Sequence, residues 1–379
     1  MADATYGEIT EAGLEELESR FGEPIDEPQP YHEEATKDTI RHWANGIGTD
    51  NPLYTDEEYA SNGPYGEIVA PPSFLYSASK IVSGYVGGLP GVHAMYAGTD
   101  WDFEKPIRRG TTIEPESHLH DYELYDTEFA GEAVRQIYRT KFYDGSGDLL
   151  ATADSWCFRT ERDTASKDKK KYDSGDDAME TAQWDEEDIE RFADHYRNEE
   201  PRGSDTRYFE DVDEGQELDK LLKGPMTVTD VIAYDQGWGG LYIHGHRNKF
   251  AMMDDHPALM IENHHGAPEP PECVHWNGQF AARVGVPEPY DYGPERVSWL
   301  GHVAHHWMGD DGFLESLYGE VRRHNLMGDV TWCTGEVAEK YRDGDKHLVD
   351  VDLIAHNHRD QLSAEGSATI RLPSRESGQ

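Results

Sequence analysis

The feature that most constrains the fold of this chain is an internal repeat, because two stretches show the same order of predicted elements. Each stretch opens with a short amphipathic helix, at residues 37–47 and 229–236, followed by a glycine-rich segment. A longer apolar helix comes next, at residues 72–84 and 294–308, and each begins with a proline, which favours the first turn of a helix. The repeat predicts two similar halves.

A run of strands follows the longer helix in each half. The last two strands of each run are joined by a short polar turn, at residues 143–148 and 356–361, which favours antiparallel pairing. One long helix followed by antiparallel strands predicts an α+β fold with the sheet wrapped around the helix. The strands are predicted at residues 94–103, 112–123, 132–143 and 149–159 in the first half, and at 315–324, 330–341, 347–356 and 362–372 in the second.

The composition changes between the two halves. Residues 163–206 are polar and acidic, which predicts a linker, and apolar side chains at helical spacing predict a helix within it at 184–196. We therefore expect an N-terminal domain at 1–162 and a C-terminal domain at 207–379. The C-terminal domain contains a long insertion at 247–292, and insertions of this length tend to be functional loops.

The charge of the chain is strongly negative. It has 34 basic and 76 acidic residues, a formal net charge of -42, and the acidic residues are spread along its whole length. This pattern resembles proteins of halophilic archaea, in which salt screens the repulsion. The alternative is an ordinary acidic protein. A negative surface repels phosphate backbones, so we expect no nucleic-acid partner, and coenzyme A would need local arginine or lysine.

The sequence also indicates the compartment. The three cysteines, Cys157, Cys273 and Cys333, include no CxxC pair, which fits a reducing cytoplasm. The N-terminus is acidic and polar, unlike a signal peptide. No apolar run reaches the roughly 18 residues that a membrane span needs. We therefore expect a cytoplasmic protein without membrane contact.

Two motifs in the first half carry a family resemblance. GTDNPLYTDEEYAS at 48–61 and GEIVAPPSFL at 66–75 resemble the MaoC-like dehydratases and (R)-specific enoyl-CoA hydratases, whose signature is S-G-D-x-N-P-x-H and a later His-Gly. Asn51 and Pro52 match, and residues 321–337 resemble the family's strand pair. The resemblance implies a double hotdog fold, with two copies of a long central helix wrapped by an antiparallel sheet. It also implies interconversion of a 2-enoyl thioester and a 3-hydroxyacyl thioester.

The catalytic residues of the family are not matched in the first half. Its aspartate and histidine fall on Thr49 and Tyr54, and neither side chain is a good general base near neutral pH. The His-Gly pair has become Pro71-Pro72, which lacks the N–H donors of an oxyanion hole. We therefore expect a non-catalytic first half that accommodates the acyl group, with Asn51 and Tyr54 binding substrate.

The second half contains a different set of candidate catalytic residues. When the spacing of the motif is measured from the first helix of this half, the position of the family's catalytic histidine falls on Gly245. Histidines flank it on both sides, at His244 and His246. We expect His244 to be the general acid or base, Asp235 its partner, and the N–H of Gly293 at a helix start the donor to the thioester carbonyl. The alternative is that the two histidines lie on a surface loop.

Three further residues near the end of the insertion are predicted to bind substrate. They are His275 and Trp276, which we expect to line a pocket, and Asp291, the next candidate for an acid or base. The alternative for His275 and Trp276 is local packing.

A metal site is not favoured by the sequence. His302 and His306 are four residues apart and share a helix face, but position 303 is valine where a zinc-protease helix has glutamate. Zinc also needs a third ligand, which the sequence does not identify. We assign no metal and no cofactor, and coenzyme A or an acyl carrier enters only as part of the substrate.

Other functions stay open because a fold does not fix a reaction. The absence of the aspartate from both halves favours a catalytically silent acyl-thioester-binding protein, or a subunit completed by a partner hydratase. A thioesterase is a weaker alternative. The sequence does not decide between a homodimer and a paired subunit.

Overall fold

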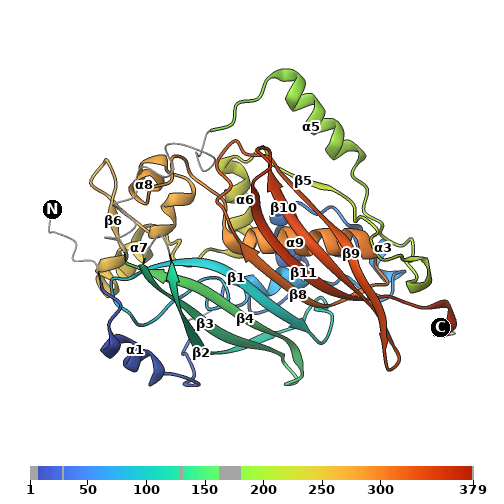
Figure 1. Ribbon diagram of the computed structural model, residues 1–379, viewed down its shortest axis with the longest axis horizontal. Helices are drawn as coiled ribbons and strands as arrows, with labels where there is room; N and C mark the ends of the chain where they lie inside the picture. Colours follow the sequence, from blue (N-terminus) through green and yellow to red (C-terminus); the bar gives the residue numbers. More distant parts are fainter. Residues whose placement is uncertain (1–6, 28–29, 128–130, 162–180, 378–379) are drawn as a thin grey trace.

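A large antiparallel sheet forms the body of the molecule. The structure is a computed structural model that describes residues 7–27, 30–127, 131–161 and 181–377. Nine strands within these ranges form one sheet, in the order β2-β3-β4-β1-β8-β11-β10-β9-β5. The eight predicted strands are confirmed, and β5 is an addition (Figure 1). The bounds are β1 (His93–Phe103), β2 (Ile113–Thr127), β3 (Gly131–Asp144), β4 (Leu149–Thr160), β5 (Leu221–Lys223), β8 (Phe313–Val321), β9 (Thr331–Asp343), β10 (Lys346–Asn357) and β11 (Leu362–Arg371).

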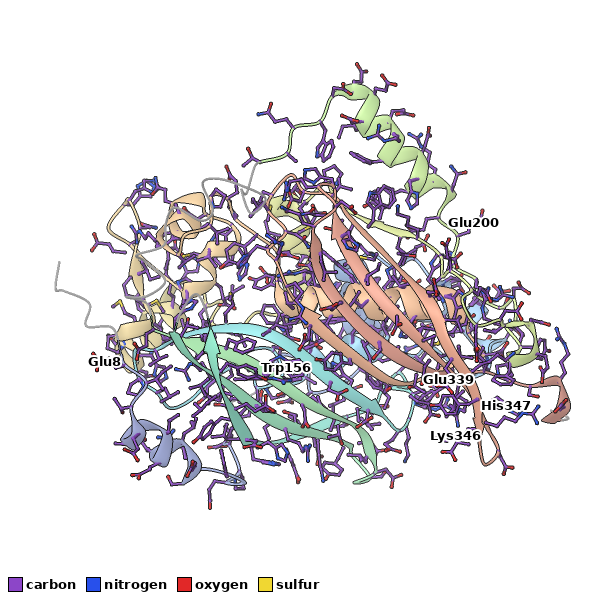
Figure 2. The ribbon with its side chains drawn as sticks, viewed as in Figure 1. Glu8, Trp156, Glu200, Glu339, Lys346 and His347 are labelled. Atoms are coloured by element: carbon purple, nitrogen blue, oxygen red, sulfur yellow. The ribbon has the colours of Figure 1, made fainter. Side chains whose placement is uncertain are left out.

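The two halves join where β1 pairs with β8. Gly98 of β1 lies at this junction, and a Cβ at that position would come 2.3 Å from the ring of Trp156. Because glycine has no side chain here, Trp156 of β4, which Figure 2 labels, reaches across β1. It stacks on Tyr318 of β8, with ring centroids 5.6 Å apart. The aromatic pair ties the two halves of the sheet together.

The central helix of the second half is α9 (Gly293–Met308), which confirms the helix predicted there. Pro294 occupies its first turn, and it ends at Gly309, whose φ of 74° suits glycine. The helix packs against β1 and β8 to β11, and nearly all of its side chains are buried. Polar residues on this helix are therefore placed inside the molecule.

The first half does not contain the long helix predicted for residues 72–84. It has a 3₁₀ helix, η2 (Pro72–Ser77), after which the chain makes turns. Serine side chains give the reason. Ser77 donates to the main-chain carbonyl three residues before it, and Ser83 donates to the carbonyl of Tyr76. Such bonds compete with the hydrogen bonds of a helix.

Two shorter helices, α2 (Lys37–Ile47) and α6 (Val228–Trp238), lie side by side and hold equivalent places in the two halves. A threonine precedes each helix, and a glycine in the left-handed conformation follows each, at Gly48 and Gly239. Both helices were predicted from the sequence. The largest cluster of buried apolar side chains draws on both halves, so they share one core.

The linker contributes the helix α5 (Glu186–Asn198), as predicted. The indole N–H of Trp184 donates to the carbonyl of Gly328 at 2.7 Å, and the Tyr196 hydroxyl donates to that of Gly224 at 2.6 Å. The helix is therefore anchored to the second half.

The remaining described helices are short, and α7 and α8 belong to the insertion.

Residues 162–180 of the predicted linker lie outside the described residues. Among the helices that the structure describes, none is long and apolar enough to cross a membrane. The remaining elements are α1 (Glu11–Glu18), α3 (Glu57–Ser61), α7 (His246–Asp255), α8 (Gly278–Arg283), β6 (Ile261–Glu262), β7 (Pro268–Glu269), η1 (Pro52–Tyr54), η3 (Phe209–Asp211), η4 (Pro257–Leu259), η5 (Pro271–His275) and η6 (Arg375–Ser377).

Candidate active site

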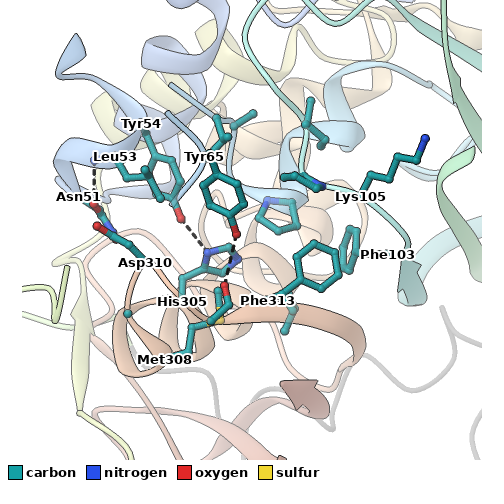
Figure 3. A pocket seen from close by; sticks show the side chains of 18 residues that line it. Asn51, Leu53, Tyr54, Tyr65, Phe103, Lys105, His305, Met308, Asp310 and Phe313 are labelled. Carbon is teal, nitrogen blue, oxygen red and sulfur yellow. Dashed lines mark hydrogen bonds between the residues drawn. The ribbon is translucent and has the colours of Figure 1, made fainter. Parts of the chain in front are cut away.

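A pocket of about 510 Å³ lies where the loop after α2 meets the C-terminal end of α9 (Figure 3). A smaller pocket of about 270 Å³ adjoins it and shares Tyr54, His305 and Leu314 with it. A largely apolar cavity with a few polar groups is the usual form of a ligand site. The apolar lining of the larger pocket includes Leu53, Val69, Pro72, Phe103, Ile107, Met308, Phe313 and Leu314.

The polar centre of the pocket is a tyrosine–histidine pair. A hydrogen bond of 2.7 Å joins the Tyr54 hydroxyl and Nδ1 of His305, which come from different halves (Figure 3). Burial lowers the pKa of His305 to about 4 and raises the pKa of Tyr54 well above its ordinary value. Both groups are therefore neutral near pH 7. Among the described residues, Nε2 of His305 has no hydrogen-bond partner.

A buried carboxylate holds the loop that carries Tyr54. Asp310 is 3% exposed and accepts hydrogen bonds from the Asn51 amide at 3.0 Å and the Tyr59 hydroxyl at 2.6 Å. Asn51 also caps η1, since its side-chain oxygen accepts from the N–H of Leu53 at 2.9 Å. The Asn-Pro motif thus fixes the orientation of Tyr54. Asn51 and Tyr54, both predicted to bind substrate, line the same pocket.

Basic side chains gather at the mouth of the pocket although the chain is strongly acidic. Lys105 is exposed and lines the pocket. The guanidinium of Arg108 lies 5.9 Å from the ring centroid of Tyr65, and that of Arg371 lies 4.9 Å from the ring of Phe313; both rings line the pocket. Lys105, Arg108 and Arg371 are called the basic rim below. Each also pairs with a carboxylate: Lys105 with Asp148, Arg108 with Glu67 and Arg371 with Glu315.

A second group of polar residues lies in the second half, around Asp235. Oδ1 of Asp235 is buried and has no hydrogen-bond partner among the described residues. Burial raises the pKa of Asp235 to about 8, helped by the Glu272 carboxylate. Glu272 accepts the N–H groups of Leu241 and Tyr242 at 2.5 and 2.7 Å, and burial raises its pKa to about 7. Two carboxyl groups therefore titrate near neutral pH.

Tyr292 connects this group to His275. Burial raises the pKa of the Tyr292 hydroxyl and Asp235 raises it further, although this hydroxyl makes no hydrogen bond among the described residues. The ring centroid of Tyr292 lies 3.8 Å from that of His275. Nδ1–H of His275 donates to the carbonyl of Tyr290 at 2.7 Å, and burial lowers the pKa of His275 to about 4. The cluster of Asp235, Glu272, Tyr292 and His275 is called the second-half cluster below.

The structure brings together only some of the residues predicted for the second half. Asp235 and His275 meet at Tyr292, which directly precedes Gly293 in the chain. The ring of Tyr96 covers the α-carbon of Gly293, since a Cβ there would come 2.2 Å from that ring. His244 is exposed.

The other two predicted residues make structural contacts. Asp291 is 1% exposed, forms a 2.9 Å ion pair with Arg296 and accepts from the amide of Asn325 at 2.9 Å. Trp276 packs among apolar side chains of the insertion, next to Phe280. Their role as substrate-binding residues stays a prediction.

Neither His305 nor Asp310 was predicted from the sequence to be a site residue. Both belong to the run HVAHHWMGDDG at 302–312, where a histidine cluster and a carboxylate pair are visible. Nothing in the sequence shows that this run meets the Asn51–Tyr54 loop, because the contact forms between elements 251 residues apart.

Comparisons with known structures identify the fold. A structure named as a MaoC-like dehydratase matches over 94% of this chain and 99% of its own, with a TM-score of 0.63 and 17% identity. A conserved hypothetical protein from Mycobacterium tuberculosis, reported to have a double hotdog fold, matches over 94% and 97%, with a TM-score of 0.54 and 9% identity. The chain has a double hotdog fold.

Sequence comparisons cover a smaller part of this double hotdog. Residues 21–152 match the family described as FAS1-like, dehydratase domain region. A UPF0336 protein from Streptomyces avermitilis is 26% identical over 141 residues, which are 36% of this chain and 89% of that protein. The sequence likeness to a dehydratase region thus falls on the half that provides Asn51 and Tyr54.

Proposed function

We propose that this double hotdog protein interconverts a 2-enoyl thioester and a 3-hydroxyacyl thioester, with the acyl group in the pocket between the halves. The observation that carries the proposal is the hydrogen-bonded pair of Tyr54 and His305 in the wall of a largely apolar pocket. Tyr54 stands at the position that the family resemblance gives to a catalytic histidine. His305 of the other half supplies an imidazole at that place.

The pair suits proton transfer to and from water. With the proton of His305 on Nδ1 and donated to the Tyr54 oxygen, Nε2 is free to accept a proton from water. As that proton leaves, the water oxygen bonds to the β-carbon of the enoyl thioester. The imidazole then returns the proton to the α-carbon, so that one water has been added.

Tyr54 has a different part in this reaction. Because its pKa is raised, the hydroxyl keeps its proton and donates a hydrogen bond. We place the thioester carbonyl oxygen at this donor, since negative charge develops on that oxygen in the transition state. Asp310 and Asn51 are positioning residues that hold the loop.

The basic rim fits a substrate carried by coenzyme A. The phosphates of coenzyme A would contact Lys105, Arg108 and Arg371 beside the larger pocket. The acyl group would enter the apolar part of that pocket. Elsewhere the acidic surface repels such an anion. We therefore favour acyl-CoA over an uncharged thioester as the substrate.

The second-half cluster is the competing place for the same reaction. The sequence predicts His244 as the general acid or base, Asp235 as its partner and the N–H of Gly293 as the carbonyl donor. Because His244 is exposed, Asp235 is the candidate base of this cluster in the structure. The raised pKa of Asp235 would make that base effective only in mildly alkaline solution. We favour the Tyr54–His305 pair because it lines a pocket.

The test is an assay with a panel of enoyl-CoA thioesters at high salt, following the loss of enoyl absorbance. We expect His305→Ala to lower kcat roughly 10²- to 10⁴-fold, which is typical for the loss of a general base, with little change in Tm. Asp235→Asn and His244→Ala are the comparison variants and should keep kcat within a few-fold. The opposite ranking would move the reaction to the second-half cluster.

The same assay separates the other functions. A hydratase leaves the thioester intact, whereas a thioesterase releases a free thiol. If no substrate of the panel reacts while acyl-CoA still binds to the pure protein, a silent binding protein or an incomplete subunit becomes the better account.

A further inference from the structure

We propose that Glu199, His302 and His306 bind a divalent transition-metal ion of the zinc type between the linker and α9. One ligand atom of each residue lies within 4.8 Å of the ligand atoms of the other two. The sequence alone favours no metal site, because it does not identify a third ligand beside the two histidines. The structure identifies a third ligand, Glu199, which is more than 100 positions away in the chain.

The two histidines are placed by the helix that carries them. His302 and His306 are one turn apart on α9, so both rings lie on one face of the helix. Both are buried, 5% and 6% exposed, and their ring centroids are 6.0 Å apart. In a neutral imidazole one ring nitrogen keeps a lone pair, which each of these rings can offer to an ion.

The carboxylate comes from the end of the linker helix. Glu199 directly follows the last residue of α5. The next residue, Glu200, is labelled in Figure 2 at the point where the chain leaves that helix. The Glu199 side chain is 12% exposed, and its Oε2 is buried without a hydrogen-bond partner among the described residues. A buried carboxylate oxygen without a partner is unfavourable, and a bound cation removes that cost.

A second polar atom without a partner lies beside the first. Nε2 of His195 is buried, makes no hydrogen bond in the part of the chain that the structure describes, and lies 3.8 Å from Oε2 of Glu199. His195 is one turn before Glu199 on α5. It can therefore orient the carboxylate or complete the set of ligands.

A lysine orients one of the rings. Nζ of Lys223 lies 2.8 Å from Nδ1 of His302 and donates to the carbonyl of Ile47 at 2.9 Å. Nε2 of His302 has a lone pair for an ion when Nδ1 carries the ring proton and donates it to Nζ of an uncharged Lys223, because a metal-binding histidine donates its other ring N–H.

The chemistry of the set selects the class of ion. Two imidazoles and one carboxylate are typical ligands of zinc and neighbouring transition metals, whereas magnesium and calcium prefer oxygen ligands alone. The ion would tie the end of α5 to α9. His302 also lines the smaller pocket, so the metal site adjoins the proposed reaction site without including Tyr54 or His305.

The test is calorimetric titration of Zn²⁺ into the metal-free, untagged chain in about 2 M KCl, so that weak binding to the acidic surface is screened. We expect one tight site in each chain and a rise in Tm on binding. Glu199→Gln keeps the shape of the side chain, and His306→Ala removes a ring. Each should weaken Zn²⁺ binding on the order of 100-fold or more, because even the partners of metal ligands contribute 10- to 100-fold.

His42→Ala, which removes an exposed histidine on α2, is the matched control and should bind Zn²⁺ like the natural chain. Co²⁺ in place of Zn²⁺ should give visible ligand-field absorption that Glu199→Gln changes. Equal binding by all variants, or binding no tighter than that of Mg²⁺, would overturn the proposal. These readouts do not involve catalysis, so they stand even if the proposed reaction is wrong.

Discussion

Gly237 of α6 lies directly against Trp43 of α2: a Cβ at position 237 would come 2.8 Å from the α-carbon of Trp43. The reverse contact is made by Gly46 of α2, where a Cβ would come 3.0 Å from the α-carbon of Tyr234. Each helix therefore offers a glycine to the backbone of the other. This reciprocal contact is what an internal two-fold relation between the two halves produces.

The first prediction is that Gly237→Ala destabilises the fold. The new methyl group has no room against Trp43, and overpacking of this kind costs about 1–3 kcal/mol of the free energy of unfolding, partly offset by better helix propensity. Urea unfolding at constant KCl measures the change. Gly278→Ala is the control, because its Cβ would meet only ordinary contacts, at 3.7 Å or more. A Gly237→Ala variant as stable as the natural chain would contradict the close contact.

Much of the fold could be predicted from local patterns. The spacing of apolar residues was enough for α2 and α6, and Pro294 helped to place the start of α9, because these signals depend on neighbours in the chain. The helix predicted at 72–84 was wrong for a local reason as well. Ser77 and Ser83 bond back to the main chain, and the apolar spacing does not report such bonds.

The candidate site was less predictable because it forms between distant segments. Asn51 and Tyr54 were selected through a motif, Asp235 as a substitute for the aspartate that the motif lacks in the second half, and His275 through its place in the insertion. The partners that give these residues a chemical role, His305 for Tyr54 and Tyr292 for Asp235, are brought in by the packing of the halves. The spacing of apolar residues along the chain does not predict how the two halves pack.

The second prediction concerns salt. With a net charge of -42, repulsion between acidic side chains should destabilise the fold when it is unscreened. We expect Tm to rise as KCl is increased from about 0.1 M to about 3 M, over which the Debye length falls from about 10 Å to below 3 Å. Differential scanning calorimetry measures this. A Tm that stays constant or falls would argue against adaptation to high salt.

The third prediction concerns the basic rim. Lys105→Glu and Arg371→Glu should each raise KM for an acyl-CoA roughly 2- to 5-fold with little change in kcat, because exposed charge pairs contribute up to about 1 kcal/mol. A thioester of a short, uncharged thiol should show no such change, since it lacks the phosphates. Arg191→Glu on α5, a similarly exposed arginine, is the control variant. Equal effects on both substrates would mean that the rim does not recognise phosphate.

The fourth prediction concerns the hydroxyl of Tyr54. Tyr54→Phe keeps the ring but removes the proposed donor to the thioester carbonyl, and loss of one such donor typically lowers kcat about 10²- to 10³-fold. Tyr59→Phe is the matched control, because its hydroxyl bonds to Asp310 and its side chain is not part of the pocket lining. We expect that variant to lose at most a few-fold in kcat. Similar losses in both variants would reduce Tyr54 to a structural role.

The last prediction uses pH to separate the two candidate bases. His305 must be neutral to accept a proton, and its pKa of about 4 means that it is neutral throughout the range from about pH 6 to about pH 9. Asp235 must instead be ionised, and its pKa of about 8 means that most molecules would hold it protonated at pH 7. A His305 base therefore predicts a kcat that is flat over this range and falls only as the pH approaches about 4. An Asp235 base predicts a kcat that rises with pH through about 8, and Asp235→Asn would abolish that rise. Measured with a saturating enoyl-CoA at constant salt, a rising profile that Asp235→Asn removes would transfer the reaction to the second-half cluster.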